Sequence, residues 1–180
     1  MVNVTLKGDV KQFESGISVA EIAKSIGMGL YKAACAGKIN GKVVDLRTPV
    51  TEDCELAILT FDDPEGKQAY WHTTSHVMAQ AVKRLYPQAK FWVGPVISEG
   101  FYYDIDLGDE VIKEEDLAKI EKEMKKIAKD GKRIVRKEIS KEEALEMFQD
   151  DPYKIDLISD LEDGTITCYQ QGEFIDLCRG

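Results

Sequence analysis

Trp71-His72-Thr73-Thr74-Ser75-His76 opens the long helix, predicted from Gln68 to Leu85, around which the second part of this chain is built. The segment holds the only two histidines of the 180 residues and spaces them four apart. Residues four apart lie on one face of a helix, so both imidazoles are expected to point into the same small volume. Cys178, far along the chain, is a natural third member of such a site. A His-x-x-x-His helix with a distant cysteine is typical of hydrolytic or metal chemistry.

Downstream of this helix the pattern predicts a compact α+β unit. A second helix is predicted from Glu114 to Lys129, because apolar residues recur there at helical spacing and Gly131 can cap its end. The apolar face of the first helix is predicted to consist of Val77, Met78, Ala81, Val82 and Leu85. The remaining elements are strands at 91–97, 101–105 and 133–139, a short helix that Ser140 begins and Asp151-Pro152 ends, and a hairpin of 165–169 with 173–178.

Residues 1–62 are predicted to form a small sheet that clasps one helix. Strands are expected at 2–6, 10–13 and 54–61, with a hairpin around Asn40-Gly41. Ser18 and Glu21 have the spacing of a capping box and are expected to begin the helix. The polar segment 63–67 contains Pro64 and Gly66 and is predicted to be a linker, after which residues 68–180 form the second domain.

Composition limits the class of protein. Charged residues make up 32% and hydrophobic residues 43%, so a buried core is expected. No apolar run is long enough to span a bilayer, and the first residues lack the pattern of a signal peptide. The four cysteines form no Cys-x-x-Cys pair and are expected to be free thiols. We therefore expect a cytoplasmic protein with no membrane partner.

Charge is distributed unevenly along the chain. The net charge of −9 argues against a general nucleic-acid binder. Basic residues nevertheless dominate from Lys119 to Lys141, and acidic residues dominate from Glu142 to Asp163. The basic stretch could contact a phosphate backbone, or it could be a solvated helix face with Glu–Lys pairs.

The histidine pair suggests two kinds of chemistry. Imidazole titrates near neutrality, so one histidine can take a proton from water while the other orients it. Two imidazoles and the Cys178 thiolate could instead supply three zinc ligands and leave a fourth position open. The same unit contains Tyr103, Lys154 and Asp176, whose side chains can donate or accept hydrogen bonds or hold a charged group. The residues alone do not separate a metal-held water from one that is activated directly.

Three motifs carry a resemblance to a known family: Trp71 to His76, Gly94-Pro95-Val96-Ile97 through Gly100-Phe101-Tyr102-Tyr103-Asp104, and Phe174-Ile175-Asp176-Leu177-Cys178-Arg179-Gly180. They resemble the N-terminal region of the bacterial threonyl-tRNA synthetases, and the resemblance covers the whole chain. It implies a leading TGS domain, which is a ubiquitin-like β-grasp unit, followed by an α+β editing domain of the threonyl/alanyl-tRNA synthetase type. The family's last motif continues with Pro and His, so a truncated fragment without the class II core is expected.

The resemblance implies a function. The whole enzyme would be an ATP-dependent threonine–tRNA ligase, and this part would hydrolyse mischarged seryl-tRNA(Thr). Serine lacks only the β-methyl group of threonine, and one methyl group is worth about 1–3 kcal/mol in a binding pocket. A second site that admits serine and excludes threonine corrects the error. The implied partners are the 3′ end of tRNA(Thr) carrying serine and the rest of the synthetase.

The family's catalytic positions correspond to four residues here. His72 and His76 would orient the substrate and the water, with His72 handling the proton. Lys154 would support the reacting groups by its charge. Cys178 would line the pocket.

Substrate binding and metal content are also implied by the resemblance. Tyr103 and Asp176 would recognise the amino acid or the adenosine, Asp176 by pairing with the α-ammonium. The related alanyl domain holds zinc at an equivalent His/His/Cys/His set, whereas the threonyl family is described as working without it. No metal is therefore predicted, and His72, His76 and Cys178 would be the ligands if zinc were bound. ATP, magnesium and the synthetic zinc belong to the core that this sequence lacks.

Two other classes of protein remain as alternatives. The chain could be a TGS-containing RNA-docking module without catalysis, although docking does not require a His-x-x-x-His helix. It could also be a freestanding editing factor of the alanyl type, although such factors lack a leading TGS domain.

Overall fold

The computed structural model describes residues 1–162, 164 and 166–178. The chain divides into two compact units, Met1–His72 and Thr73–Gly180, and the division falls within the helix α3 (Pro64–Leu85). Three residues of the predicted last hairpin and motif, Thr165, Arg179 and Gly180, lie outside the described residues.

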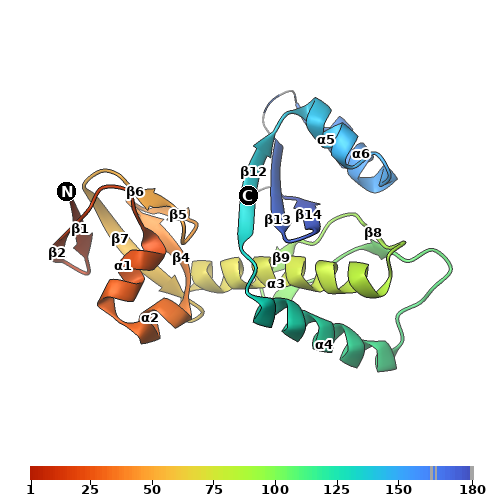
Figure 1. Cartoon of the computed structure of the whole chain (residues 1–180), viewed down its shortest axis with the longest axis horizontal. Coiled ribbons are helices and arrows are strands. Elements are labelled where there is room, and N and C mark those ends of the chain that lie inside the picture. The colour runs from red at the N-terminus through yellow and green to blue at the C-terminus, as the bar shows by residue number, and fades with distance from the viewer. Residues whose placement is uncertain (163, 165, 179–180) are drawn as a thin grey trace. The chain divides into compact units, whose positions relative to one another are not determined.

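The first unit is built on a five-stranded mixed sheet in the order β2-β1-β7-β4-β5 (Figure 1). The central pair β1–β7 is parallel, and the other pairs are antiparallel. The strands are β1 (Val2–Leu6), β2 (Asp9–Phe13), β4 (Ala34–Ile39), β5 (Lys42–Val44) and β7 (Cys54–Thr60), with a small ribbon of β3 (Ile17–Ser18) and β6 (Pro49–Val50). This is the β-grasp arrangement that the sequence predicts.

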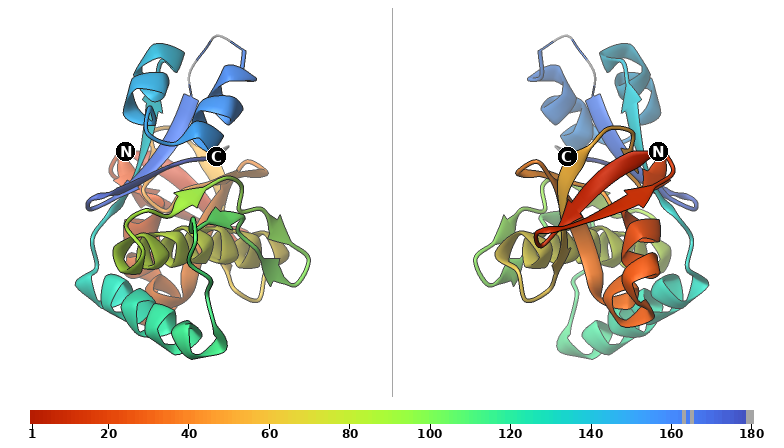
Figure 2. Two further views of the ribbon diagram at one scale, coloured as in Figure 1. Left: turned by 90° about the vertical axis from the view of Figure 1, so that its right-hand side faces the viewer. Right: turned by 90° about the vertical axis from the view of Figure 1, so that its left-hand side faces the viewer.

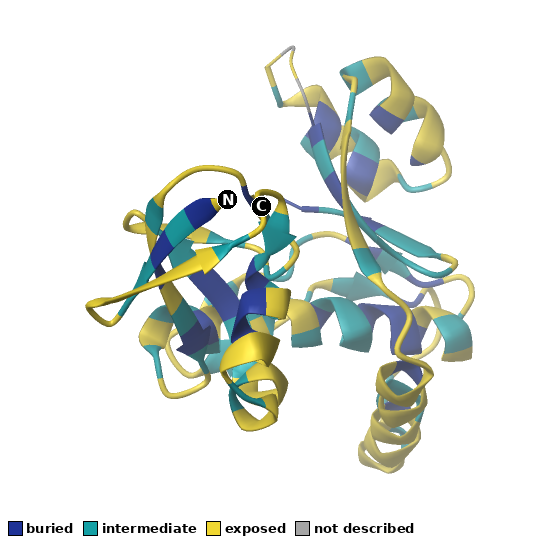
Figure 3. Ribbon diagram, turned by 60° about the vertical axis from the view of Figure 1, so that its left-hand side comes forward, coloured by how far each residue is buried: buried dark blue, intermediate teal, exposed yellow. Residues whose placement is uncertain are grey.

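The helix α1 (Val19–Ile26) supplies the core of this unit. Ser18 caps it as expected, because its hydroxyl accepts the Glu21 backbone N–H at 3.2 Å while the Glu21 carboxylate accepts the Ser18 N–H at 3.0 Å. Its apolar face packs onto the sheet, and Figure 3 shows the buried strip of the strands in dark blue. The right-hand view of Figure 2 shows α1 followed by a short helix, α2 (Met28–Ala33), which the sequence did not predict.

The predicted linker at 63–67 is wrong, because α3 begins at Pro64. Proline suits the first helical position, where its missing N–H costs nothing. The Asp63 carboxylate accepts the Thr60 N–H at 2.7 Å, and the Asp63 carbonyl accepts the Lys67 N–H at 2.8 Å. Gly66 permits this tight join, since a Cβ there would lie 2.0 Å from the Thr60 carbonyl oxygen. A Pro/Gly segment that reads as a linker is thus the first turn of the helix.

The second unit contains an antiparallel sheet in the order β12-β13-β14. Its elements are β12 (Ile134–Ile139), β13 (Ile166–Gln171), β14 (Phe174–Leu177), α4 (Glu114–Asp130), α5 (Lys141–Met147) and α6 (Pro152–Ser159). Two-stranded ribbons join β8 (Lys90–Phe91) to β11 (Ile105–Asp106) and β9 (Val96–Ile97) to β10 (Gly100–Phe101). The left-hand view of Figure 2 shows this sheet with its helices.

The two faces of this sheet pack against different helices. Phe174 belongs to the apolar cluster built on α3 and α4, whereas Ile175 and Leu177 join the cluster built on α5 and α6. Because side chains alternate along a strand, Asp176 and Phe174 lie on the face toward α3. The alternation of β14 therefore decides which of its residues meet the histidine helix.

Three predictions for this unit need correction. The strands expected at 91–97 and 101–105 are only two-residue ribbons with irregular chain between them. Asp151-Pro152, expected to end a helix, instead begins α6: the Asp151 carboxylate accepts the backbone N–H of Tyr153 at 3.0 Å. Leu85, expected on the buried face of α3, is 39% exposed because it lies in the last turn.

Candidate functional site

Asp176 on β14 is the centre of the site, and it is only 1% exposed. Its Oδ1 lies 2.7 Å from the ammonium of Lys154 and accepts the Leu177 backbone N–H at 2.9 Å. Its Oδ2 accepts the Tyr103 hydroxyl and lies 3.3 Å from Nδ1 of His76. A carboxylate has about four lone-pair positions. Four polar groups of the protein therefore surround this carboxylate.

Burial and these donors act on Asp176 in opposite directions. Burial alone would raise the pKa of the carboxyl group, because it disfavours the charged form. Hydrogen bonding by His76 and the charge of Lys154 outweigh burial and hold the pKa of Asp176 below its usual value. The carboxylate is therefore ionised at neutral pH and can fix the orientation of the His76 ring.

His76 projects from α3 toward the sheet. Its ring stacks on Tyr169 of β13 with a centroid distance of 5.9 Å and an interplanar angle of 24°. Tyr169 stands opposite Asp176 in the β13–β14 ladder. Cross-strand neighbours point to the same side of a sheet, so Tyr169 and Asp176 hold the imidazole between them.

Lys154 comes from the first turn of α6 and is 3% exposed. Asp151 fixes this turn, because its carboxylate accepts the Lys154 backbone N–H at 3.2 Å and the Phe91 N–H at 3.4 Å. The Lys154 ammonium also donates to the Trp92 carbonyl at 3.1 Å. A buried charge must be paired, and Asp176 provides the pairing.

Tyr103 approaches the site from the irregular chain after β10. Its ring packs over Gly94, where a Cβ would fall 2.4 Å from the ring, and edge-on to Phe91 at 5.5 Å. Burial and the Asp176 carboxylate raise the pKa of the Tyr103 hydroxyl well above its usual value. Tyr103 therefore remains a hydrogen-bond donor at every physiological pH.

His72 and Cys178 complete the set of predicted residues. His72 lies one turn before His76 on α3, and the potential ligand atoms of His72, His76 and Cys178 all lie within 4.8 Å of one another. Burial first, and then the nearby Asp176 charge, raise the pKa of the Cys178 thiol to about 12. A thiol with this pKa is neutral at pH 7, so it suits a pocket wall better than a nucleophile.

The same three residues offer the donor atoms of a zinc site. Two imidazoles and one sulfur fit zinc in kind, and the contact of His76 with a carboxylate is typical of zinc-bound histidines. Zinc binds cysteine as the thiolate, so binding here would release the proton of Cys178.

Sequence reasoning missed a second polar cluster next to the site. Gln80 and Arg84 continue the four-residue spacing of the histidines along α3, and that spacing is the signal that could have revealed them. The Arg84 guanidinium binds Glu173 at 2.8 Å and Glu123 of α4 at 3.1 Å. Gln80 donates to the Gln171 carbonyl at 3.3 Å. These contacts connect the β13–β14 turn to α3 and α4. Glu173 in this turn precedes Asp176 by three residues.

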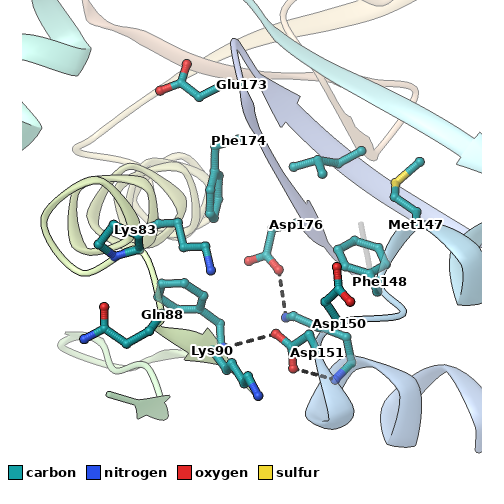
Figure 4. Close-up of a pocket in the computed structure, with 14 residues that line it drawn as sticks. Lys83, Gln88, Lys90, Met147, Phe148, Asp150, Asp151, Glu173, Phe174 and Asp176 are labelled. Atoms are coloured by element: carbon teal, nitrogen blue, oxygen red, sulfur yellow. Dashed lines mark hydrogen bonds and ion pairs between the residues drawn. The ribbon is translucent and has the colours of Figure 1, made fainter. Parts of the chain in front are cut away.

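A cavity of about 500 Å³ borders the site (Figure 4). Its lining includes Lys154 and Asp176 together with Phe91, Phe148 and Phe174. Lys83 and Asp151 also reach it, but their charged groups already bind the protein: Lys83 donates to the Ala89 carbonyl at 2.7 Å. The charged groups of these two residues therefore help to hold the fold.

No helix in the described part of the chain combines the length and apolar character needed to cross a membrane. Residues 1–60 match the family model of the TGS domain. The chain thus combines a TGS domain with a second α+β unit that contains a buried, ion-paired carboxylate.

Comparison with known proteins is more specific. Across its whole length the chain is 55% identical, over 182 residues, to a threonine–tRNA ligase of Clostridium botulinum (strain Eklund 17B). It is 53% identical to that of Desulforamulus reducens and 50% identical to that of Acetivibrio thermocellus, each over 184 residues. The chain spans only 28–29% of the length of these relatives. It is homologous to the N-terminal part of threonine–tRNA ligases.

Proposed function

We propose that the residues around Asp176, with His72 of α3, hydrolyse the ester bond of seryl-tRNA(Thr), the mischarged product of a threonine–tRNA ligase. The observation that carries the proposal is the convergence of His76, Lys154 and Tyr103 on the buried Asp176, with His72 and Cys178 adjacent. Structural stability alone gives no reason to gather two imidazoles, a lysine and a carboxylate in one place, because buried ion pairs are weak stabilisers. Homology to threonine–tRNA ligases supports the choice of substrate.

The proposed reaction is general-base hydrolysis. A water molecule attacks the ester carbonyl and His72 takes its proton. The bond to the 3′ oxygen then breaks, His72 returns the proton to that oxygen, and the products are serine and tRNA with a free 3′ hydroxyl. Asp176 keeps His76 oriented, and the Lys154 ammonium favours the negative charge that develops on the ester oxygen. Cys178 contributes to the wall that excludes the methyl group of threonine.

Pairing of Asp176 with the substrate ammonium requires one of its present donors to move. Tyr103 and His76 are held by ring packing, whereas Lys154 has a flexible chain. We therefore infer that the Lys154 ammonium occupies, in the free protein, the position that the α-ammonium of serine takes when substrate binds. Displaced in this way, Lys154 lies beside the ester.

The proposal includes neither metal nor cofactor in this unit. The partner is the serine-carrying 3′ end of tRNA(Thr), together with the rest of a synthetase. A reducing compartment such as the cytoplasm suits the four free thiols.

The test compares release of serine from seryl-tRNA(Thr) with release of threonine from threonyl-tRNA(Thr). Wild-type chain should prefer the serine ester, and His72→Ala should lose about 10²-fold or more in rate, the usual range for a general base. Thr73→Ala is the matched control, because Thr73 is the next residue on α3 and is exposed. Equal rates on the two esters, or full activity in His72→Ala, would refute the proposal. Stoichiometric zinc in the purified chain by elemental analysis would refute its metal-free form.

A further inference from the structure

Arg136 on β12 belongs to the same sheet as Asp176, but the proposed reaction gives it no role. It is paired with Tyr169 in the β12–β13 ladder, so both side chains lie on the same face of the sheet. That face carries His76 through the stacked Tyr169 ring, and Asp176 through the next strand. Arg136 therefore lies two strands from Asp176, on the side where the reacting ester would be held.

The contacts of Arg136 connect it to the site. Its Nη2 donates to the Thr167 hydroxyl at 3.3 Å, and the Thr167 carbonyl accepts the Cys178 backbone N–H at 3.0 Å. The charge of Arg136 is felt at the Cys178 thiol, where it opposes the rise in pKa that burial causes. Its Nη1 binds the Glu138 carboxylate at 2.5 Å. The side chain is 45% exposed, so solvent or a ligand can reach the guanidinium.

Arg136 differs from the other cation of the site. Lys154 is buried, and Asp176 neutralises it. Glu138 also binds Arg136, but that pair is half exposed and screened by water. An incoming anion can therefore replace Glu138 at low cost, whereas Lys154 of the free protein is held by the buried Asp176.

The substrate of the proposed reaction supplies such an anion. The serine ester is attached to the terminal ribose of the tRNA, and a phosphate group lies on the 5′ side of that same ribose. Arginine binds phosphate oxygens through paired N–H donors. We propose that Arg136 binds the phosphate group 5′ to the terminal nucleoside of the substrate, with Glu138 holding the guanidinium in place until the RNA arrives. This inference rests on the proposed function.

The strand itself provides a matched control. Lys137 is the next residue of β12 and is also exposed, but its side chain points to the opposite face. Removing either charge changes the net charge by the same amount. An effect confined to Arg136 therefore reports its location.

The experiment uses two substrates, seryl-tRNA(Thr) and 3′-O-seryl-adenosine, the second of which has no phosphate. Arg136→Gln should raise KM for seryl-tRNA about tenfold to a hundredfold, and this loss should exceed any loss on seryl-adenosine by at least tenfold. It should also reduce the salt dependence of log KM by about 0.7, the value for one single-strand phosphate contact. Glu138→Gln should lower KM for seryl-tRNA, because it removes the competing carboxylate. Lys137→Gln should leave both substrates unchanged.

Equal losses on the two substrates, or the same loss in Lys137→Gln, would overturn the inference. A direct binding measurement separates it from the proposed function. The trinucleotide CCA can be titrated into wild-type chain and Arg136→Gln by NMR, with no hydrolysis required. Equal affinities would overturn the role of Arg136 even if the chain hydrolyses seryl-tRNA. Weaker binding by the variant would support that role even if the isolated chain hydrolyses nothing.

Discussion

Replacing Lys154 by methionine tests the electrostatics of the site most directly. Lys154→Met keeps the length of the side chain and removes the ammonium that lies 2.7 Å from Asp176. Removing one partner of a buried ion pair usually costs about 3–5 kcal/mol, because the other charge stays buried and uncompensated. Asp176 keeps His76, Tyr103 and the Leu177 N–H. We therefore expect the lower end, a loss of about 3 kcal/mol in the free energy of unfolding at pH 7.

The loss should depend on pH with a definite sign. The folded-state pKa of Asp176 lies below its usual value in the wild type, so its ionised form stabilises the fold above that usual value, and this contribution is lost as the pH falls. Without Lys154, burial is less well compensated and the folded-state pKa rises. Asp176 in the variant then takes up a proton readily in acid. The difference between wild type and Lys154→Met should shrink as the pH falls from 7 toward about 4.

Urea unfolding can measure this difference. Trp92 lies next to Lys154, and its fluorescence reports the second unit in a Trp71→Phe background. Lys125→Met is the control, because Lys125 pairs with Glu121 at 2.6 Å on the exposed face of α4 and should cost nothing measurable. Adding Asp176→Asn to Lys154→Met should restore part of the stability, since no buried charge is then left over. A loss below about 1 kcal/mol, or one that stays constant with pH, would contradict the reasoning.

Three further predictions concern the surroundings of the site. Gly94→Ala should destabilise the second unit by about 1–3 kcal/mol in urea unfolding, because the added Cβ would lie 2.4 Å from the Tyr103 ring. Gly29→Ala is the control and should be neutral or stabilising, because the space around Gly29 is open. Equal effects of the two substitutions would count against the packing argument. Burial raises the pKa of the Cys178 thiol to about 12 and that of the Cys168 thiol to about 11. Both thiols should therefore resist iodoacetamide at pH 8 until the chain unfolds, which mass spectrometry can measure. If Cys178 is labelled as fast in the folded chain as in the unfolded chain, the expectation is wrong. Glu173→Gln should cost less than about 1 kcal/mol in the free energy of unfolding, because the pair of Glu173 with Arg84 is partly exposed. The backbone N–H of Glu173 and the Arg84 side chain lower the pKa of Glu173 to about 2, so the cost should be present above pH 5 and vanish as the pH falls toward 2. A cost that persists at pH 2 would rule out an electrostatic origin.

Local features were predictable wherever neighbouring residues decide them. Ser140 and Glu143 form the predicted capping box, with the Glu143 N–H donated to the Ser140 hydroxyl at 3.2 Å. Asn40 and Gly41 have the positive φ angles that a two-residue hairpin requires, and Gly131 ends α4 in the left-handed region. These signals involve residues within a few positions of one another, so no tertiary contact is needed to read them.

Elements whose conformation depends on distant residues were predicted poorly. The sequence from Phe91 to Ile105 has the pattern of strands, but only short two-residue ribbons form there. Its other backbone groups bond across irregular chain, as the Trp92 N–H does when it donates to the Asp104 carbonyl at 3.0 Å. Asp151-Pro152 is compatible with the end of one helix and with the start of another, and the contact of Asp151 with the Phe91 N–H fixes the second outcome. In both cases local propensity is weak, and packing decides.

The sequence by itself determined the pairing of His72 with His76, because helical spacing alone places them on one face. It also determined the β-grasp fold of the first unit and the resemblance that singled out Tyr103, Lys154, Asp176 and Cys178. Only the tertiary structure decided that Lys154, the one basic residue in a long acidic stretch, is buried against Asp176, and that Arg136 lies on the face of the sheet that holds His76. The physical reason is the range of the interactions. Spacing along a helix is set by backbone geometry, whereas burial of a charge depends on a partner that another part of the chain must supply.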